Sequence, residues 1–382
     1  MKNIFKRLFC RCWQSLSRTN EQQCNAPTVQ SSDINNSTKS NTKDCDNSDS
    51  ATNANLLQAH VKKDDAECIS PHLVNSYNAN IDKDSVKKTD DGCILRKSSY
   101  MQLTDAKYIA GISLQGRSHL SCGVECQDFH NIKDLGNGWL LVMVSDGAGS
   151  AKESARGSEA NCKIIERLLV KLFEEKGWIK NNYLPDDKEW YIEMYNILFL
   201  TQEIITEKAK EQGFEPRLLN ATIIVLIITP RGMLSAHIGD GRMGYKSANG
   251  KWHSLMIPHK GEEANQTVFV PNEWNMLTIP AFRMSGVNVP ETRVVQECPM
   301  AFVLMSDGCE RSMWQCSSFN ESIQKYEDLN QPYDKFLDPL FTDVGAQKGE
   351  EQRIDRLMFI TDAGTRTCLR EQDDRTIIIG QL

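Results

Sequence analysis

The sequence lacks several features that would place it in a special class of protein. No segment of the 382-residue chain approaches the roughly 20 consecutive apolar residues that a membrane-spanning helix needs. Its 12 prolines and 23 glycines are too few for a collagen-like or Pro/Gly-rich chain. Acidic residues outnumber basic ones by 51 to 44, which gives a formal charge of −7. Because nucleic-acid-binding surfaces are usually basic, we expect no nucleic-acid partner.

The 13 cysteines are scattered, and no Cys-x-x-Cys pair occurs among them. Their number is odd, and the charges of Lys6, Arg7 and Arg11 interrupt the short apolar run that a secretory signal would need near the N-terminus. We therefore expect reduced thiols and a cytoplasmic location rather than a disulfide framework. A zinc site is not expected, since no second Cys or His pair lies near Cys10 and Cys12.

Residues 1–18 form a basic amphipathic segment. They carry five Lys or Arg side chains and no acidic one, and Phe5, Leu8, Phe9 and Cys12 would share one face of a helix. Such a segment can lie on an anionic membrane surface, which would make the protein peripheral at the membrane. It can equally be a frayed terminus or a segment that docks on a partner protein.

Residues 19–100 differ in composition from the rest of the chain. They are rich in Ser, Asn, Thr, Asp and Lys and nearly devoid of aromatic residues, so they cannot bury enough apolar area to offset the entropy lost on ordering. We interpret them as a disordered linker. The composition changes near Tyr100, and residues 101–382 are predicted to form one globular domain.

The apolar pattern of this domain predicts a layered arrangement of helices and strands. Residues 139–145 are continuously apolar and end at Asp-Gly, as in a buried strand followed by a turn. Apolar residues recur at helical spacing in two long segments, and a hairpin of two apolar strands follows them, which favours antiparallel pairing. The predicted helices cover 151–177 and 187–212, and the further strands cover 221–229, 233–239, 243–247, 277–280, 301–306 and 375–379.

Four aspartates lie at the edges of apolar strands: Asp128, Asp146, Asp307 and Asp373. A strand end fixes the backbone of such a residue and leaves its carboxylate at the rim of a sheet. Several carboxylates that meet at one rim repel each other unless a cation lies between them. An all-oxygen set favours Mg²⁺ or Mn²⁺. Any single Asp-Gly is more often a turn than a metal ligand, so only the repeated pattern indicates a metal site.

The ordered set of motifs resembles the protein phosphatase 2C family, in its compact bacterial-type branch. The motifs are QD (127–128), SDGAGS (145–150), IGDGR (238–242), SDG (306–308) and DDRT (373–376), supported by the segments 116–128, 220–227 and 261–269. The resemblance covers about 108–382. It implies an α+β fold in which two face-to-face, mainly antiparallel β-sheets are flanked by α-helices, a four-layer αββα sandwich, here preceded by the disordered N-terminal extension.

The resemblance also implies a metal centre with named ligands. Asp146 would bridge two ions, Gly147 would offer its carbonyl oxygen, and Asp240 would be linked to a weaker third ion. Asp374 replaces the usual Asn and would support its neighbours. The implied ligands are Asp128, Asp146, Gly147, Asp240, Asp307 and Asp373.

The function implied is that of a metal-dependent serine/threonine protein phosphatase. Water activated at a binuclear Mn²⁺ or Mg²⁺ centre would hydrolyse phosphoserine or phosphothreonine, with Asp146 and Asp128 as catalytic carboxylates. The substrate would be a phosphoprotein, and a serine/threonine kinase would be a partner. No nucleophilic cysteine is required, and no Cys-containing phosphate loop ending in Arg occurs.

Three departures from the family pattern leave an alternative open. Gln127 stands where Glu is usual, Ala148 stands where a His is usual, and the customary phosphate-binding Arg has no counterpart at its spacing. Arg117 and His119, in an expected loop, become the candidates for phosphate contact. The alternative is a non-catalytic phosphatase-fold module that binds or regulates.

Other polar residues have structural explanations. We expect His237 to be a sheet residue, Arg242 to form a structural ion pair, and Cys126 to be a buried, inert thiol. Asn265 and Thr267 would either shape a turn or belong to a flap over the metal edge.

Overall fold

The computed structural model describes residues 87–260, 267–271, 288–316, 318–367 and 372–382, without the side chains of 364–367. The predicted segment 1–18, most of the predicted linker, Asn265 and the predicted strand 277–280 lie outside these residues. Within the described part, no helix is long and apolar enough to cross a membrane. No disulfide joins any two of the described cysteines.

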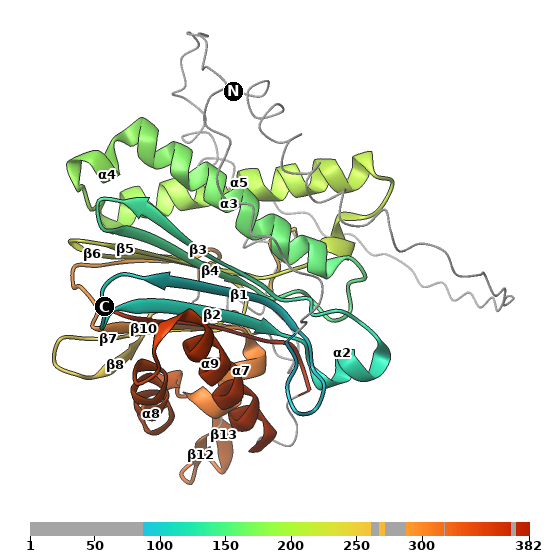
Figure 1. Ribbon diagram of the computed structural model, residues 1–382. Helices are drawn as coiled ribbons and strands as arrows, with labels where there is room; N and C mark the ends of the chain where they lie inside the picture. The colour runs from blue at the N-terminus through green and yellow to red at the C-terminus, as the bar shows by residue number, and fades with distance from the viewer. Residues whose placement is uncertain (1–86, 261–266, 272–287, 317, 368–371) are drawn as a thin grey trace, which may run out of the picture. The chain divides into compact units, whose positions relative to one another are not determined.

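Two antiparallel sheets form the centre of the domain (Figure 1). Every pair of neighbouring strands in them is antiparallel. The six-stranded sheet has the order β1 (Leu95–Gln102), β2 (Tyr108–Leu114), β15 (Arg375–Gln381), β10 (Ala301–Met305), β7 (Arg242–Lys246) and β8 (Trp252–Ser254). The five-stranded sheet has the order β3 (Phe129–Gly136), β4 (Trp139–Ser145), β5 (Ile223–Thr229), β6 (Gly232–Ile238) and β9 (Glu291–Val295).

Helices cover the outer face of each sheet, which gives four layers (Figure 1). On the five-stranded sheet lie α3 (Ser154–Lys176), α4 (Trp178–Asn181) and α5 (Asp187–Glu211), with η1 (Pro216–Leu219) beside α3. On the six-stranded sheet lie α7 (Asp307–Met313), α8 (Asp334–Gly345) and α9 (Gly349–Thr367). A short helix, α2 (Arg117–Cys122), follows β2.

The core consists of three apolar clusters, one between each pair of layers. The central cluster joins the two sheets and includes Val142, Leu226, Phe302 and Ile378. Because β4 and β5 bury side chains on both faces, all seven residues of each are buried, and their sequences read as continuous apolar runs rather than alternating ones. The fold class predicted from the sequence is therefore confirmed.

The predicted boundaries agree closely with the observed ones for the long elements. Strand β4 matches 139–145, and α3 and α5 begin and end within three residues of the predicted helices. The start of the domain differs. Strand β1 begins at Leu95 and pairs along its length with β2, so residues 95–100, which we placed in the linker, belong to the six-stranded sheet.

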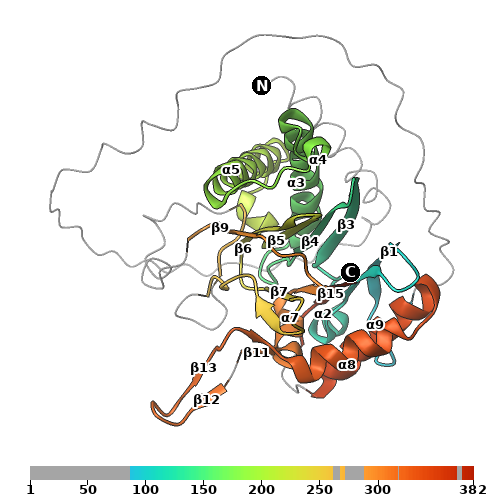
Figure 2. The same ribbon diagram turned by 90° about the vertical axis from the view of Figure 1, so that its left-hand side faces the viewer.

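An insertion between α7 and α8 was not expected from the sequence. Residues 314–333, which we call the arm, contain β11 (Trp314–Gln315), β12 (Ser318–Asn320), β13 (Lys325–Glu327) and β14 (Gln331–Pro332). Strand β11 pairs with β14, and β12 pairs with β13, so the arm is a long hairpin built from two short ladders. Figure 2 shows β12 and β13 projecting away from the layered body.

Candidate active site

The topology brings five aspartates to one edge of the sandwich. In the five-stranded sheet, Phe129 pairs with Ser145, so Asp128 before β3 and Asp146 after β4 lie side by side. In the six-stranded sheet, Met305 of β10 pairs with both Arg242 of β7 and Ile377 of β15. The same edge therefore carries Asp240 before β7, Asp307 after β10 and Asp373 before β15. We call these five residues the carboxylate edge.

The electrostatics of Asp146 reflect the other carboxylates of the edge. Burial raises the pKa of Asp146 well above its usual value, and the charges of Asp128, Asp307, Asp373 and Asp240 raise it further. Burial likewise raises the pKa of Asp307, followed by the charges of Asp240 and Asp373, while a hydrogen bond with Asp146 lowers it. Acids from both sheets thus oppose one another's ionisation, and a cation between them would relieve this repulsion.

Asp128 is the most buried member of the edge, with 1% of its surface exposed. Ser306 Oγ donates a hydrogen bond of 2.7 Å to Asp128 Oδ2, and the Thr376 N–H donates one of 2.9 Å to Ser306 Oγ. Burial and the neighbouring charge of Asp374 raise the pKa of Asp128 to about 7. Ser306, the serine of the second Ser-Asp-Gly motif, therefore links the two sheets. From the sequence alone it was only part of a turn.

Asp374 organises the backbone around this edge. Its Oδ1 accepts a hydrogen bond of 2.6 Å from the Gly116 N–H, and its Oδ2 accepts one of 2.5 Å from the Gln127 N–H. It therefore holds the end of β2 against the residue that precedes Asp128. This agrees with the supporting role that we expected for Asp374.

Two glycines of the Ser-Asp-Gly motifs are required by close packing. A Cβ on Gly147 would lie 2.6 Å from the Gln127 carbonyl oxygen, and one on Gly308 would lie 1.9 Å from the Asp374 carbonyl oxygen. Both contacts are with backbone atoms that cannot move aside. The glycines after Asp146 and Asp307 thus allow segments from different strands to pack closely beside those carboxylates.

Asp240 lies between a basic and an acidic neighbour. Burial raises its pKa to about 6; Lys260 opposes this increase and Glu310 adds to it. Lys260 Nζ lies 2.9 Å from Glu310 Oε1, and Thr267, which also contacts Asp240, donates its hydroxyl to the His259 carbonyl oxygen. No sequence motif indicated Lys260 or Glu310 as part of this site. Glu310 lies three residues after Asp307, one helical turn from it.

The donor set fits divalent cations such as Mn²⁺ or Mg²⁺. All five side chains of the edge offer oxygen, the ligand that these cations prefer. Asp307 Oδ1 is buried and has no hydrogen-bond partner among the described residues. Buried polar atoms rarely lack a partner, and an ion is one explanation when they do. At one end of the edge, His119, Asp373 and Asp374 place ligand atoms within 4.8 Å of one another.

The profile of the protein phosphatase 2C family matches residues 115–357, more than half of the chain. The chain belongs to this family. The family resemblance stated from the motifs is therefore confirmed. Among curated proteins, none matches this sequence.

Solved structures resemble this chain only distantly. The Staphylococcus aureus serine/threonine phosphatase Stp1 is 12% identical, with 75% of this chain and 99% of that chain covered and a TM-score of 0.46. The S. agalactiae serine/threonine phosphatase is 16% identical, with 72% and 98% covered and a TM-score of 0.43. RsbX in complex with magnesium is 15% identical, with 75% and 100% covered and a TM-score of 0.41. The family assignment does not depend on them.

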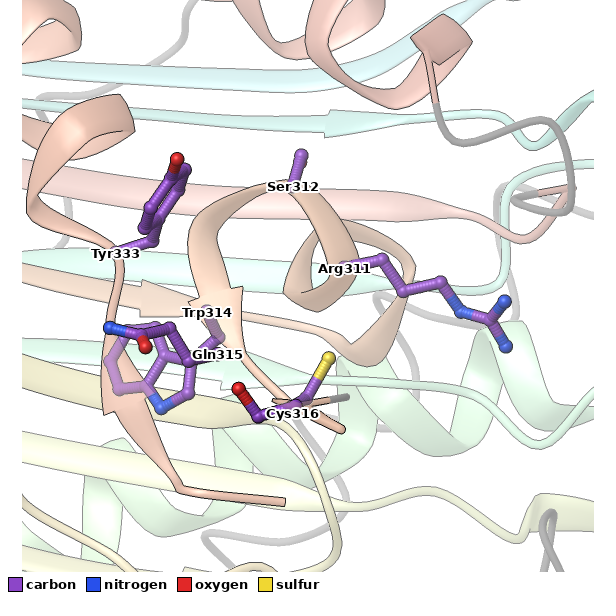
Figure 3. Close-up of a pocket in the computed structure, with 7 residues that line it drawn as sticks. Arg311, Ser312, Trp314, Gln315, Cys316 and Tyr333 are labelled. Carbon is purple, nitrogen blue, oxygen red and sulfur yellow. The ribbon is translucent and has the colours of Figure 1, made fainter. Parts of the chain in front are cut away.

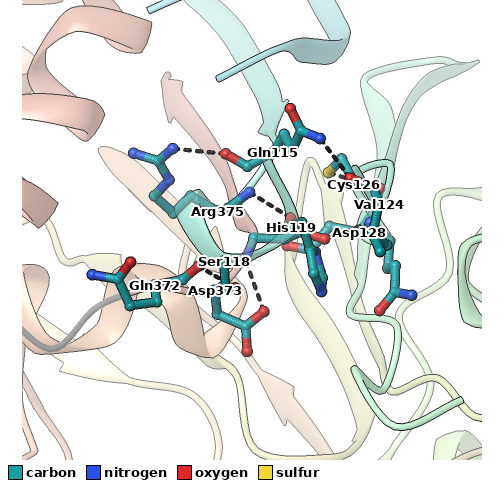
Figure 4. A network of polar contacts seen from close by, with 12 residues as sticks. Gln115, Ser118, His119, Val124, Cys126, Asp128, Gln372, Asp373 and Arg375 are labelled. Carbon is teal, nitrogen blue, oxygen red and sulfur yellow. Dashed lines mark hydrogen bonds and ion pairs between the residues drawn. The ribbon is translucent and has the colours of Figure 1, made fainter. Parts of the chain in front are cut away.

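His119 lies close to the carboxylate edge of this phosphatase 2C domain. It belongs to helix α2 and not to a loop as predicted, because the backbone of 117–122 closes a helical turn that ends at Gly123. Its Nδ1 lies 2.9 Å from Asp374 Oδ1, and 13% of its side chain is exposed. This contact with Asp374 raises the pKa of His119, and the charges of Asp374, Asp373 and Asp128 add to this effect. Figure 4 shows His119 among Asp128, Asp373 and Arg375.

Arg117, the other candidate for phosphate contact, is held in ion pairs. Its Nη2 lies 2.9 Å from Asp362 of α9, and its Nε lies 3.1 Å from Asp91. Arg375 shares Asp362 at 2.6 Å and donates to the Gln115 carbonyl oxygen (Figure 4). The described structure therefore gives Arg117 a role in joining α2 to α9, and a phosphate would have to compete with two carboxylates for it.

The structural roles expected for three other residues are confirmed. His237 is buried in β6, stacks on His259 and interacts with the Ile257 carbonyl oxygen at 3.0 Å. Arg242 is fully buried and pairs with Glu310 and Asp328. Burial raises the pKa of Cys126 well above its usual value, which keeps the thiol protonated and unreactive.

Proposed function

We propose that this chain is a metal-dependent protein phosphatase that hydrolyses phosphoserine and phosphothreonine. The observation that carries the proposal is the meeting of five aspartates from both sheets at one edge, where the charges of the other four raise the pKa of Asp146. Such an arrangement is unfavourable without a counter-charge and favourable with one. Membership of the phosphatase 2C family gives this site its chemistry.

The proposed ligands are those of the carboxylate edge together with the Gly147 carbonyl group. Asp146 lies in electrostatic contact with each of the other four aspartates, which suits a residue shared between two ions, and Asp240 lies toward Lys260, which suits a separate third position. Bound Mn²⁺ or Mg²⁺ would supply positive charge for the phosphoryl oxygens and would make water at the site more acidic.

His119 is the titratable side chain that we assign to proton donation at this site. Ala148 offers no titratable group where the family usually has His. The raised pKa of His119 favours a charged ring that still exposes part of its surface beside Asp373. We propose that His119 donates a hydrogen bond to a phosphoryl or leaving-group oxygen, while Asp374 fixes the orientation of the ring.

The second candidate function is a non-catalytic binding module. Ala148 and the commitment of Arg117 to Asp362 and Asp91 favour it. This second function explains the structure less well than the phosphatase function, because it assigns no role to the five carboxylates.

Hydrolysis of p-nitrophenyl phosphate tests the enzyme proposal. Purified protein should hydrolyse it with Mn²⁺, and both EDTA and Asp146→Asn should reduce the rate by at least about a hundredfold, since each removes charge stabilisation at the reacting group. Asp134→Asn is the matched control, because Asp134 is exposed near the end of strand β3. A Mn²⁺-saturated rate no higher than that of Asp146→Asn would refute catalysis. The binding module would then be supported by phosphopeptide binding without turnover.

The N-terminal extension provides two further proposals. Residues 1–18 would attach the enzyme to a membrane surface or to a partner such as a serine/threonine kinase, and the protein would otherwise be cytoplasmic. Unchanged vesicle sedimentation after deletion of 1–18 would remove the membrane proposal.

A further inference from the structure

The arm presents an unusual apolar surface. Near its tip, Tyr326 is 71% exposed and Phe319 is 49% exposed, with their rings packed edge to face at 5.2 Å. Ile323 and Leu329 are also exposed. A two-stranded ribbon is rarely stable alone, and exposed apolar residues gathered on one often mark a binding surface.

The base of the arm is held firmly in place. Arg242 Nη1 donates to Asn330 Oδ1 at 2.8 Å, and its Nη2 donates to Asp328 Oδ2 at 2.5 Å. Asn330 Nδ2 donates to the Met256 carbonyl oxygen at 2.6 Å, and Trp314 Nε1 donates to Asn330 Oδ1 at 3.1 Å. A fully buried guanidinium is costly unless it is well paired, so the domain stabilises this one projection with strong polar contacts.

The same contacts connect the arm to the carboxylate edge. Arg242 lies two residues after Asp240, and its Nε donates to Glu310 of α7 at 2.8 Å. Lys260 Nζ lies 2.9 Å from Glu310 and 3.6 Å from Asp328. One charged cluster thus touches the Asp240 loop, the helix that begins at Asp307, and the arm.

A pocket of about 300 Å³ lies where α7 meets the arm. Its lining includes Ser312 at the end of α7 and Trp314, Cys316, Ser318 and Tyr333 of the arm (Figure 3). Glu310, Lys260 and Asp328 act electrostatically on Cys316, so the pocket borders the charged cluster. Arg311 and Gln315 make part of its wall polar, while its size and the side chains of Trp314 and Tyr333 suit one large aromatic side chain of a peptide.

We propose that the pocket and the arm bind the segment of the phosphoprotein substrate that flanks its phosphorylated residue. This rests on the proposed phosphatase function. Helix α7 has seven residues and runs from Asp307 at the carboxylate edge to the pocket, a length of about 10 Å. An extended peptide advances roughly 3.3 Å per residue. When the phosphate of a substrate lies at the carboxylate edge, a peptide side chain about three to five residues away therefore lies at the pocket. The peptide beyond that residue reaches the arm.

The test compares a small substrate with phosphopeptides. The peptides carry phosphothreonine and one phenylalanine about three to five residues before or after it, and matched peptides carry serine in place of phenylalanine. The variants are Phe319→Ser/Tyr326→Ser at the arm tip and Ser318→Trp, which fills the pocket. The control is Tyr191→Ser/Phe199→Ser, which removes two exposed rings from α5, on the opposite outer layer.

Wild-type protein should prefer one of the phenylalanine peptides over its serine partner. Both arm variants should reduce kcat/KM for that peptide by about tenfold through KM, as expected when one or two anchoring side chains of an interface are lost. Hydrolysis of p-nitrophenyl phosphate should stay within about twofold, because that substrate is too small to reach the arm. The α5 control should change neither.

Three results would overturn the proposal. The wild type could show no preference between the phenylalanine and serine peptides, or the arm variants could lose activity equally on the peptide and on p-nitrophenyl phosphate. The third result is that the arm variants change only self-association, measured by light scattering. If wild-type protein failed on p-nitrophenyl phosphate as well, the proposed phosphatase function would fail instead. Peptide binding by fluorescence polarisation to the Asp146→Asn variant would then decide the docking proposal separately.

Discussion

At the scale of single residues, the proposed function depends on carboxylates that the protein makes hard to ionise. Asp128 is the clearest case, since it is buried beside Asp374 and has a pKa of about 7 against an ordinary value of 3.8. In metal-free protein it binds a proton in the folded state over a pH range in which the unfolded chain has already lost it. Its contribution to the free energy of unfolding therefore decreases as pH rises from about 4 to about 7.

This gives a prediction for Asp128→Asn in EDTA. The variant has no proton to lose, so its free energy of unfolding relative to wild type should increase by about 2 kcal/mol between about pH 5.5 and about pH 8. Urea unfolding of both proteins at each pH measures the difference. The buried neutral histidines His237 and His259, whose pKa values burial lowers to about 3, have the opposite pH dependence but cancel in this comparison. A pH-independent difference would contradict the assigned burial.

A second prediction concerns the glycine after Asp307. Gly308→Ala should destabilise the domain by about 2 kcal/mol or more, because its Cβ would overlap the Asp374 carbonyl oxygen. Gly149→Ala is the control, since a Cβ there has no atom within 4 Å. Thermal unfolding of the two variants should differ clearly. Equal midpoints would show that the two segments are not packed as described.

At the scale of elements, long apolar strands and helices could be predicted from the sequence because local periodicity determines them. In strand β4 every residue is apolar because both faces are buried, and in helix α5 apolar residues recur on the one face that is buried. The edge strand β1 could not be predicted. Its residues are mostly half-buried, its composition resembles the linker, and it is ordered by pairing with β2. The arm could not be predicted either, because it is held by hydrogen bonds from Arg242, a residue distant in sequence.

The anchoring of the arm gives an element-scale prediction. Arg242→Met should destabilise the domain by about 3–5 kcal/mol, because Glu310 and Asp328 lose a buried partner. It should also speed cleavage within 314–333 under limited proteolysis, since the arm loses its main anchor. Arg293→Met is the control: Arg293 is partly exposed and pairs with Glu291 in its own strand, and its loss should cost less than about 1 kcal/mol. Similar proteolysis of both variants would contradict the anchoring role.

At the scale of the whole molecule, two stacked sheets bring distant strand ends to one edge. Four of the aspartates, Asp128, Asp146, Asp307 and Asp373, could be identified from the sequence because each lies at the edge of an apolar strand. Asp240 was identified only through the resemblance of its motif to the family pattern. The partners of these aspartates could not be identified from the sequence. Ser306 reaches Asp128 from a strand of the other sheet, and Lys260 meets Glu310 only in the folded chain. The place of His119 beside Asp374 likewise depends on α2 and β15 meeting in space.

Metal binding should stabilise this arrangement as a unit. At Mn²⁺ concentrations about a hundredfold above the dissociation constant, binding to the folded state adds about 2.7 kcal/mol to the free energy of unfolding per site. Calorimetric unfolding should show a higher midpoint with Mn²⁺, reversed by EDTA and much reduced in Asp146→Asn. A midpoint that Mn²⁺ raises equally in the variant would place the ion elsewhere.

Anomalous diffraction from crystals soaked in Mn²⁺ tests the central claim most directly. The account predicts two strong manganese peaks at the edge of the sandwich, with oxygen atoms of Asp146, Asp307 and Asp373 at bonding distance. Crystals saturated with Mn²⁺ that show no peak there, or peaks bound only by other residues, would contradict it.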